Sequence, residues 1–480
     1  MPTATRRPAR RRRTASNSNS NVRNSSETPD CRPPRSHGSR ADLRAMLGDG
    51  AAFSVMVGMG ESYFPAFALA AGLGEVAAGL VATVPLVAGA VLQLVSPAAV
   101  RRLGSHKRWV VLCAACQGLA FLPLAIGAYS GSVAAWLVFG MAAIYWGAGL
   151  ATGPAWNTWA GTLVPDNIRT GFFARRTRFT QIGTLTGFVA GGVTLQVAKL
   201  WTSSIVPFAL LFLGAALARS ISTSFLALQS EPQPPDDNHR RVSWRDLIGS
   251  GRSDGPLLVY LFAVQAAAQF AGPYFTPFML KQIHFSYIEY VLLIGVSFAA
   301  KATALPALGR LARRIGARQL LWIGGLSIVP VSGMWLASTT FAYLVFVQVA
   351  AGLAWAAYEL AMFLLFFEAI PEKERTSVLT IYNVGNALAT ATGALLGGSM
   401  LWTIGEHPTT YLAIFGLSSV ARLATLVLLT RVPPIDARAA VLPSRRILSL
   451  RPAVGSVDRP ILASLPEDDA VQSREVQCDD

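Results

Sequence analysis

Long apolar segments alternate with short charged ones from about residue 50 to about residue 430. Each apolar segment has roughly the 20 residues that a helix needs to cross the ~30 Å hydrocarbon core of a bilayer. Twelve segments can be counted, at approximately 50–72, 76–98, 109–128, 132–156, 178–198, 203–226, 256–280, 286–308, 319–337, 341–367, 377–400 and 409–430. The pattern predicts an all-α polytopic membrane protein with 12 transmembrane helices.

The second half of the chain repeats features of the first. The stretch 165–192 reads PDNIRTGFFARRTRFTQIGTLTGFVAGG, and 371–398, which lies 206 residues later, reads PEKERTSVLTIYNVGNALATATGALLGG. The pairs that align are Pro165 with Pro371, Arg169 with Arg375, Gly187 with Gly393, Gly191 with Gly397 and Gly192 with Gly398. Such a repeat at half-chain distance is typical of transporters built from two similar halves. It predicts two pseudo-symmetric six-helix halves.

Composition agrees with a membrane protein. The chain is 52% hydrophobic and 14% charged, whereas a soluble domain of 480 residues would need far more polar surface. Part of the net charge of +15 lies in RRPARRRR at residues 6–13, inside a Ser/Asn/Pro-rich stretch that predicts disorder. On a membrane protein such a stretch fixes the orientation or touches anionic lipid. We therefore expect no nucleic-acid partner.

Loop charges predict the orientation. The loops 100–108, 164–178, 309–318 and 371–376 hold fourteen Lys and Arg, and the six loops on the other side hold two. The positive-inside rule makes the first set cytoplasmic. The predicted order is a disordered basic cytoplasmic tail (1–48), a six-helix half (49–228), a cytoplasmic linker (229–255), a second half (256–431) and a disordered cytoplasmic tail (432–480). We expect a multi-pass protein of the cell (inner) membrane with both termini cytoplasmic.

Two short basic loops, VRRLGSHKR and ARRIGARQ, carry a motif. Gly309, Arg314, Gly316 and Arg318 fall in register with the Gly-x-x-x-Asp-Arg-x-Gly-Arg-Arg motif of the major facilitator superfamily, and Arg102 and Gly104 match its first copy. The chain resembles that superfamily over roughly residues 45–431. The resemblance implies the six-plus-six fold, a monomer and transport by alternating access.

The same resemblance implies a gate on the cytoplasmic side. The predicted gate residues are Gly104, Arg102, Arg169, Gly309, Arg314, Gly316, Arg318 and Arg375. In the superfamily an Asp in the motif helps to latch this gate, but here both copies have Arg, at positions 101 and 313. The latch of this chain is therefore expected to be made differently.

Glycines recur in the fifth and eleventh predicted spans. They are Gly183, Gly187, Gly191 and Gly192, and then Gly393, Gly397 and Gly398. The first four resemble a superfamily motif associated with antiporters, although Phe188 replaces its Pro. Small residues spaced in this way also let a second helix approach closely. Both interpretations, antiport and helix packing, stay open.

Few ionisable residues lie inside the predicted spans, and each is a candidate for function because burying a charge in a bilayer is costly. They include Glu61 in the first span, Lys301 in the eighth and Glu359 in the tenth. We hypothesise that a carboxylate takes up and releases a proton during transport. The alternative for Glu359 is a static ion pair with Lys301. Arg219 and Arg422, at matched positions in spans 6 and 12, are expected to snorkel to the cytoplasmic face.

Polar and aromatic residues on the spans that line the cavity in that superfamily predict the substrate site. The candidates are Gln265, Gln269, Tyr274, Trp355, Tyr358 and Tyr145. Gln265 and Gln269 share a helix face by their spacing, and Pro273 and Pro277 should kink the span that carries them. An aromatic lining suits an amphipathic or cationic organic molecule.

The leading interpretation is a secondary active transporter of a small amphipathic organic molecule, with proton-coupled efflux as a hypothesis. The expected partners are a small-molecule substrate, protons and the lipid bilayer. The alternative is a transport-dead sensor or scaffold that keeps the fold. An enzyme is not expected, since the spans hold no well-buried Asp or His and the chain has no GxSxG or GxxxxGK[ST]. No cofactor or metal is expected either; Cys113 and Cys116 read as packing residues.

Overall fold

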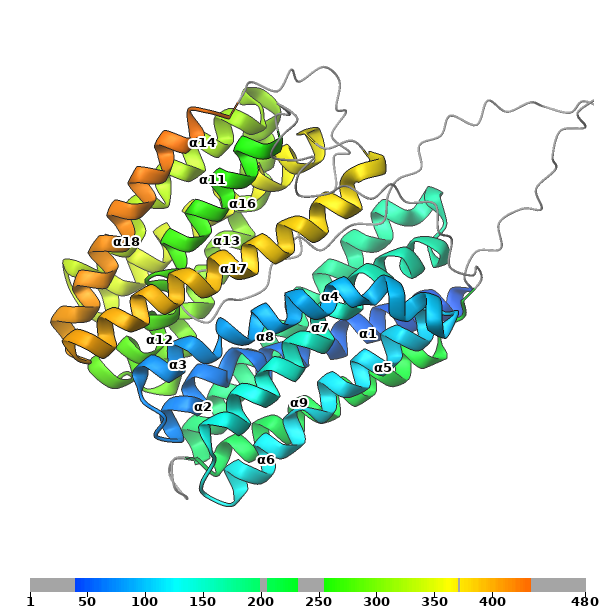
Figure 1. Cartoon of the computed structure of the whole chain (residues 1–480), viewed down its shortest axis with the longest axis horizontal. Coiled ribbons are helices and arrows are strands. Elements are labelled where there is room, and N and C mark those ends of the chain that lie inside the picture. The colour runs from blue at the N-terminus through cyan, green and yellow to red at the C-terminus, as the bar shows by residue number, and fades with distance from the viewer. Residues whose placement is uncertain (1–38, 199–204, 232–253, 370–371, 433–480) are drawn as a thin grey trace, which may run out of the picture. The chain divides into compact units, whose positions relative to one another are not determined.

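The computed structural model describes residues 39–198, 205–231, 254–369 and 372–432, and these residues form helices and their connections without a strand. Figure 1 shows the helices of the first half, in blue to green, packed as one group, and those of the second half, in green to orange, as another. The all-helical, two-half architecture predicted from the sequence is confirmed.

The first half has six spans. They are α1 (Arg40–Met59) with the 3₁₀ turn η1 (Glu61–Tyr63) and α2 (Phe64–Ala70); α3 (Glu75–Val81) with α4 (Val84–Leu103); α5 (His106–Leu119) with α6 (Phe121–Tyr129); α7 (Ala135–Leu163); α8 (Asp166–Ala198); and α9 (Pro207–Leu228). The first span breaks at η1 because Pro65 follows it and cannot donate a helical hydrogen bond.

The second half repeats this order. Its spans are α11 (Asp254–Gln269) with η2 (Gly272–Tyr274), α12 (Phe275–Pro277) and the π-helical turn η3 (Phe278–Gln282); α13 (Tyr287–Ile315); α14 (Ala317–Ser327) with α15 (Val329–Gly333) and η4 (Met334–Leu336); α16 (Phe341–Ala369); α17 (Glu372–Ile404); and α18 (Pro408–Leu429). The predicted kink at Pro273 and Pro277 is confirmed, since the helix changes type at both prolines.

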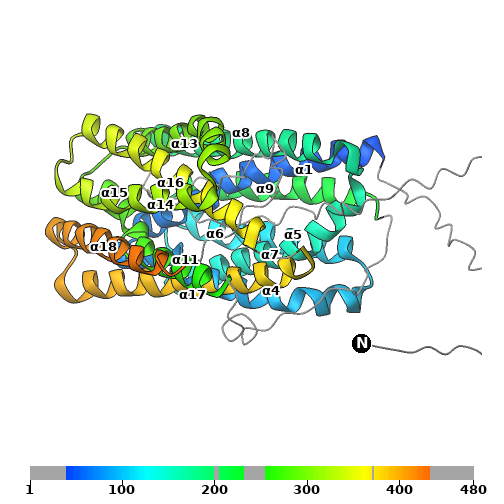
Figure 2. The ribbon, with the colours of Figure 1, turned by 90° about the horizontal axis from the view of Figure 1, so that it is seen from above.

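Equivalent helices make equivalent contacts in the two halves. α1 packs against α8 and α9, and α11 packs in the same way against α17 and α18; the pairs α4–α7 and α13–α16 also correspond. The halves meet along α17 with α3 and α4, and along α13 with α8. Figure 2 shows α17 beside α4 and α13 beside α8. The internal repeat in the sequence is therefore a repeat in the fold.

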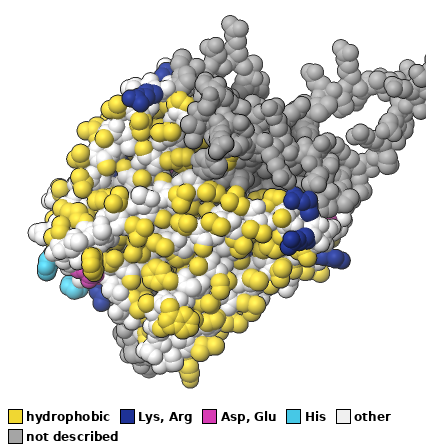
Figure 3. All heavy atoms as spheres, in the orientation of Figure 1, with side chains coloured by type: hydrophobic (Ala, Val, Ile, Leu, Met, Phe, Trp, Pro, Cys, Tyr) yellow, Lys and Arg dark blue, Asp and Glu magenta, His cyan; other side chains and the backbone are white. Residues whose placement is uncertain are grey.

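Judged by length and composition, ten of these spans could cross a membrane. The remaining two of the twelve are the broken first span and the glycine- and threonine-rich α8. Apolar side chains cover much of the face in Figure 3, with Lys and Arg toward its ends. Exposed leucines such as Leu210, Leu213 and Leu217 of α9 fit contact with lipid tails.

Three helix starts differ from the sequence prediction. α1 begins at Arg40, so residues 40–48, which we had placed in the disordered tail 1–48, are helical, and a capping box of Ser39 and Asp42 fixes this start. α8 begins at Asp166 and α17 at Glu372, so most of the predicted loops 164–178 and 371–376 are helical extensions. Hydropathy marks where a helix leaves the apolar core and not where it ends. The rest of the predicted tails and most of the linker lie outside the described residues.

Each half has an aromatic core at matching positions. In the first half Phe64, Phe67 and Phe121 gather around Phe212, with ring centroids 4.8–6.1 Å from it. In the second half Phe275, Phe278 and Trp335 gather around Phe415 at 4.2–6.0 Å. Phe212 and Phe415 each lie seven residues before Arg219 and Arg422, the matched arginines of spans 6 and 12, so equivalent residues form the centres of the two cores.

Candidate functional site

Glu61 and Tyr145 meet at the break in the first span. Glu61 opens the turn η1, and Oη of Tyr145, from α7, donates a hydrogen bond of 2.6 Å to its Oε2. Tyr145 is buried edge-on against Phe64 and Phe121, with centroids 5.4 and 5.2 Å away, so its hydroxyl is held in place. Glu61 is only half-buried. Two residues nominated separately from the sequence thus form one unit.

Lys301 and Glu359 form the ion pair that was the alternative interpretation of Glu359. Nζ of Lys301, on α13, lies 2.8 Å from Oε1 and 2.7 Å from Oε2 of Glu359, on α16. The side chains are 2% and 7% exposed. Close approach of the helices is possible because Gly352 faces the backbone of Ser297 and Lys301. A buried pair of this geometry satisfies both charges, and removing one partner would strand the other.

The other cavity candidates are buried in this structure. Nε2 of Gln265 donates to Oγ1 of Thr390 at 3.0 Å and so ties α11 to α17. Gln269 is buried on the same helix. Trp355 and Tyr358 of α16 pack perpendicular to each other at 5.6 Å. Their placement on the substrate path stays a prediction.

Tyr274 has a packing role that its counterpart Tyr63 shares. Oη of Tyr63 donates to the carbonyl of Phe188 at 2.5 Å, and Oη of Tyr274 donates to that of Ala394 at 2.5 Å. Each tyrosine lies against a glycine pair that the sequence repeat had aligned: a Cβ on Gly191 would come 2.5 Å from the Tyr63 ring, and one on Gly398 would come 2.5 Å from the Tyr274 hydroxyl. Because only glycine leaves room for these rings, the glycines serve helix packing.

The remaining glycines of the two stripes lie against helix backbones. Gly183 and Gly187 of α8 face the carbonyls of Ala51 and Val55 in α1, and Gly393 of α17 faces that of Ala266 in α11. α8 and α17 therefore hold the broken first span of each half at close range.

The predicted gate residues lie at one end of the described helices, which we call the arginine-rich end. Gly104 ends α4 and Gly316 ends α13, with φ of 63° and 85°, conformations that favour glycine. Nη2 of Arg318 donates to the carbonyl of Val432 at 3.0 Å, whereas Arg102 and Arg314 are exposed. Gly309 lies within α13 in open space. Arg169 and Arg375 belong to α8 and α17, and their side chains are outside the described part.

Sequence reasoning missed a polar cluster at the opposite end, where the halves meet. We call it the Glu75 cluster; it consists of Glu75, Gln282, Glu406 and Tyr411. Glu75, from the first half, accepts hydrogen bonds from Tyr411 and from Nε2 of Gln282, the latter at 3.0 Å. Glu406, from the second half, accepts from the backbone N–H of Glu75 at 3.1 Å and of Val76 at 3.3 Å. The sequence alone holds no signal for this cluster, because periodicity cannot pair Glu75 with partners 207 to 336 residues away.

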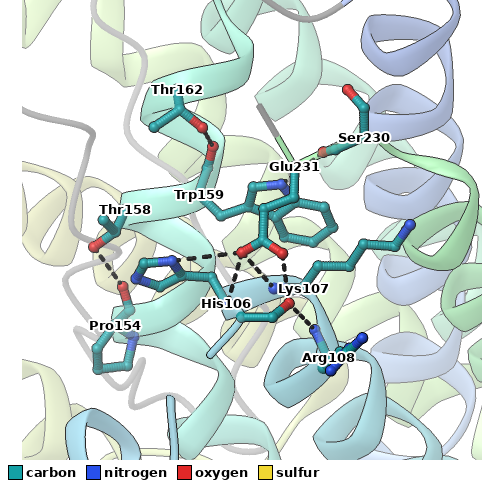
Figure 4. A network of polar contacts seen from close by, with 10 residues as sticks. His106, Lys107, Arg108, Pro154, Thr158, Trp159, Thr162, Ser230 and Glu231 are labelled. Carbon is teal, nitrogen blue, oxygen red and sulfur yellow. Dashed lines mark hydrogen bonds and ion pairs between the residues drawn. The ribbon is translucent and has the colours of Figure 1, made fainter. Parts of the chain in front are cut away.

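A second missed cluster pins the residues after α9 to the arginine-rich end (Figure 4). Glu231 accepts from the backbone N–H groups of His106 at 2.6 Å and Lys107 at 3.3 Å, and from Oγ of Ser105, so it caps the N-terminus of α5. Nε1 of Trp159 donates to the carbonyl of Ser230 at 2.9 Å. The start of the predicted linker is therefore fixed to the first half.

Arg219 and Arg422 do not snorkel, which corrects the sequence prediction. They are 3% and 1% exposed. Nη1 of Arg219 donates to Oγ of Ser222 at 2.7 Å, Ser222 donates to Asp49 at 2.7 Å, and Arg176 lies 3.3 Å from the same carboxylate. The sequence shows how deep Arg219 lies along its span. It does not show that the buried carboxylate of Asp49 on α1 is linked to this side chain.

The comparisons with known proteins decide the family. A profile of the Major Facilitator Superfamily matches residues 50–336 and 257–463. The chain belongs to this superfamily. It is therefore a multi-pass membrane protein of a transporter family, as the resemblance of its loop motifs had implied. A comparison with curated protein sequences finds no significant match.

Solved structures of other superfamily members share the fold. The nucleoside transporter NupG is 14% identical over 81% of this chain and 99% of its own, with a TM-score of 0.59. A bacterial homologue of the human lysosomal transporter Spinster, in an inward-facing conformation, is 14% identical over 82% and 94%, with a TM-score of 0.58. The human organic anion transporter MFSD10 is 18% identical over 83% and 100%, with a TM-score of 0.52.

Within the superfamily, this member joins its halves through the Glu75 cluster at the end opposite the motif loops. Arg101 and Arg313 stand where the superfamily motif has its carboxylate. Glu231 lies at the start of α5, where it accepts hydrogen bonds from the backbone N–H groups of His106 and Lys107.

Proposed function

We propose that this chain is a secondary active transporter that moves a small amphipathic organic molecule by alternating access, and that Glu61 exchanges the coupling proton. The observation that carries the proposal is the position of Glu61. It is a half-buried carboxylate at the break of the first span, with one oxygen held by Tyr145 at 2.6 Å. A carboxylate between the apolar interior and a path to water is suited to taking up and releasing a proton.

Glu359 is the weaker candidate for this role. Its two oxygens face Nζ of Lys301 at 2.7–2.8 Å, and both side chains are deeply buried. Protonating Glu359 would leave Lys301 charged in an apolar region, which is costly. The pair is better suited to fixing α13 against α16 than to proton exchange.

The arginine-rich end is proposed to face the cytoplasm of a cell whose inner membrane holds the protein. The structure joins the halves at the other end through the Glu75 cluster, which supports an arrangement closed toward the outside. Proton-driven efflux is the direction that we propose, with protons from outside reaching Glu61 when the cluster opens.

The test begins with a thermal-shift screen of amphipathic organic compounds on the purified full-length protein, since a ligand of the folded state raises its apparent stability. Compounds that stabilise the protein are then assayed for uptake into proteoliposomes with an imposed pH gradient. Glu61→Gln should lower gradient-driven uptake about tenfold or more and leave exchange of substrate between the two sides in place.

Tyr145→Phe is the matched control. It removes only the hydroxyl that donates a hydrogen bond to Glu61, so gradient-driven uptake should persist with a changed pH dependence. Equal gradient-driven uptake by wild type and Glu61→Gln would refute the role of Glu61. Binding of a compound without any flux by wild type would favour a sensor or scaffold.

A further inference from the structure

Arg422 is a buried cation in the second half, and among the described residues no carboxylate pairs with it. It lies on α18 and is 1% exposed. Its Nη1 donates to the carbonyl of Ile328 at 3.0 Å, where α14 ends and α15 begins, and its guanidinium carbon lies 5.8 Å from the centre of the Trp355 ring. In the described part of the chain its Nε has no hydrogen-bond acceptor. A neutral carbonyl does not balance a guanidinium charge.

The first half shows what balances the equivalent arginine. Arg219 reaches the carboxylate of Asp49 through Ser222. Tyr63 and Tyr274, which have the same contacts in the two halves, are 211 residues apart, and the same separation places Tyr260 at the position of Asp49. The second half therefore keeps the arginine and has a phenol in place of the carboxylate.

Two further buried donors lie around the same turn. Oη of Tyr260, which is 0% exposed, would be 2.6 Å from a Cβ on Gly325, one helical turn before Ile328. The Trp355 ring lies beside Arg422, and its Nε1 and Oη of Tyr260 have no acceptor in the described residues. An indole N–H only donates, and a guanidinium has five donors and no acceptor. Three donors of this kind in one region call for an acceptor.

We propose that this region binds a small inorganic anion of the size of chloride, held by Arg422, Trp355 and Tyr260 between α11, α14, α16 and α18. The anion does for Arg422 what Asp49 does for Arg219. It neutralises the guanidinium and accepts hydrogen bonds from the indole and the phenol. Each of these buried donors would cost free energy if it had no acceptor. Because a diffusible ion replaces a fixed carboxylate, the stability of the second half depends on the anion concentration.

The experiment measures thermal unfolding of the purified full-length protein in sodium chloride and in sodium gluconate at equal ionic strength. Chloride should raise the Tm of wild type in a saturable way, because a ligand of the folded state adds stability as its concentration exceeds its Kd. Arg422→Gln should abolish the difference between the two salts. Tyr260→Phe and Trp355→Phe should each raise the half-saturating chloride concentration about fivefold, the effect of one lost hydrogen bond.

Arg219→Gln is the matched control, because this equally buried arginine already reaches a carboxylate, that of Asp49, through Ser222. It should lower the Tm in both salts and keep the chloride response. If Arg422→Gln does not fold, the two phenylalanine variants decide the outcome. The proposal is overturned if wild type unfolds at the same temperature in chloride and gluconate, or if Tyr260→Phe and Trp355→Phe respond to chloride as wild type does.

Discussion

Asp42 connects three parts of the first half through one carboxylate. It accepts from the backbone N–H and hydroxyl of Ser39 at 2.7 and 2.9 Å, which caps α1. It also accepts from the backbone N–H and hydroxyl of Ser230 at 2.6 and 2.9 Å, which ties the end of α9 to α1. Burial alone raises the pKa of Asp42, but these hydrogen bonds to Ser230 and Ser39 outweigh it, so the pKa lies below its ordinary value.

This lowered pKa predicts a dependence of stability on pH. A carboxyl whose pKa is lower in the folded state stabilises the protein above its unfolded pKa, near 4, and loses this contribution as the pH falls through the folded pKa. Asp42→Asn should therefore destabilise the protein by about 1–2 kcal/mol near neutral pH, and the difference from wild type should shrink below about pH 4. Thermal unfolding across this pH range measures both.

Arg44→Gln is the control for Asp42→Asn, since Arg44 is an exposed residue on the same helix. It should leave the Tm unchanged. A difference between Asp42→Asn and wild type that stays constant down to about pH 3 would contradict the assignment.

At the residue scale, the sequence predicted the burial of Lys301 and Glu359 but missed that of Arg219, Arg422 and Glu75. Lys301 and Glu359 were foreseen as an alternative pair because few other charges lie at their depth. Glu61 and Tyr145 were both nominated, but their contact depends on the side-by-side placement of spans 1 and 4. Glu75 was missed because at the start of a span it resembles a solvated loop residue.

At the scale of elements, the two halves share one arrangement: a broken first span packs against a glycine-striped helix. α8 faces α1 and α17 faces α11, and a buried tyrosine from the break donates into each striped helix. The apolar runs and the aligned glycines predicted these helices and their correspondence. The breaks at Pro65 and Pro277 were only partly predictable, because proline marks where a helix is interrupted but not that a π-helical turn follows.

Gly397→Ala tests this packing. A Cβ there would meet the backbone carbonyl of Phe270 and come 2.7 Å from the Tyr274 ring, and a backbone cannot move aside as a flexible side chain can. The substitution should destabilise the protein by about 1–3 kcal/mol, as overpacking does. The measurement is the Tm of the purified protein.

Gly309→Ala is the matched comparison within a helix interior. A Cβ on Gly309 meets nothing within 4 Å, so alanine should be neutral or stabilise by up to about 1 kcal/mol through its higher helix propensity. Equal effects of the two substitutions would show that the stripe in α17 does not depend on close approach.

At the scale of the whole molecule, the contact between the halves is what the sequence could not supply. Internal repetition gave two similar six-helix halves, but a repeat does not specify how its copies dock. The Glu75 cluster joins positions 75, 282, 406 and 411 at one end. Alternating access requires that such contacts break when the other conformation forms, so the cluster should set the balance between the two conformations.

Glu75→Ala combined with Glu406→Ala removes both carboxylates of the cluster and should shift this balance toward separation of the halves at this end. The measurement is the distance between spin labels on cysteines placed at the exposed positions Ser132 and Thr339, in a variant without the native cysteines. Losing these hydrogen bonds should raise the population of the longer distance about tenfold or more.

Glu289→Gln distinguishes loss of the cluster from loss of any acidic residue at this end. Glu289 accepts hydrogen bonds from the backbone N–H and the hydroxyl of Ser286, each at 2.8 Å. Ser286 caps the helix that carries Glu289, so this residue does not connect the halves. The distance distribution of the Glu289→Gln variant should match that of wild type. If the double variant and Glu289→Gln gave the same distribution, contacts along α17 and α13 rather than the Glu75 cluster would hold this end closed. In that case Gly398, beside Val76 of the first half, would be the next position to change.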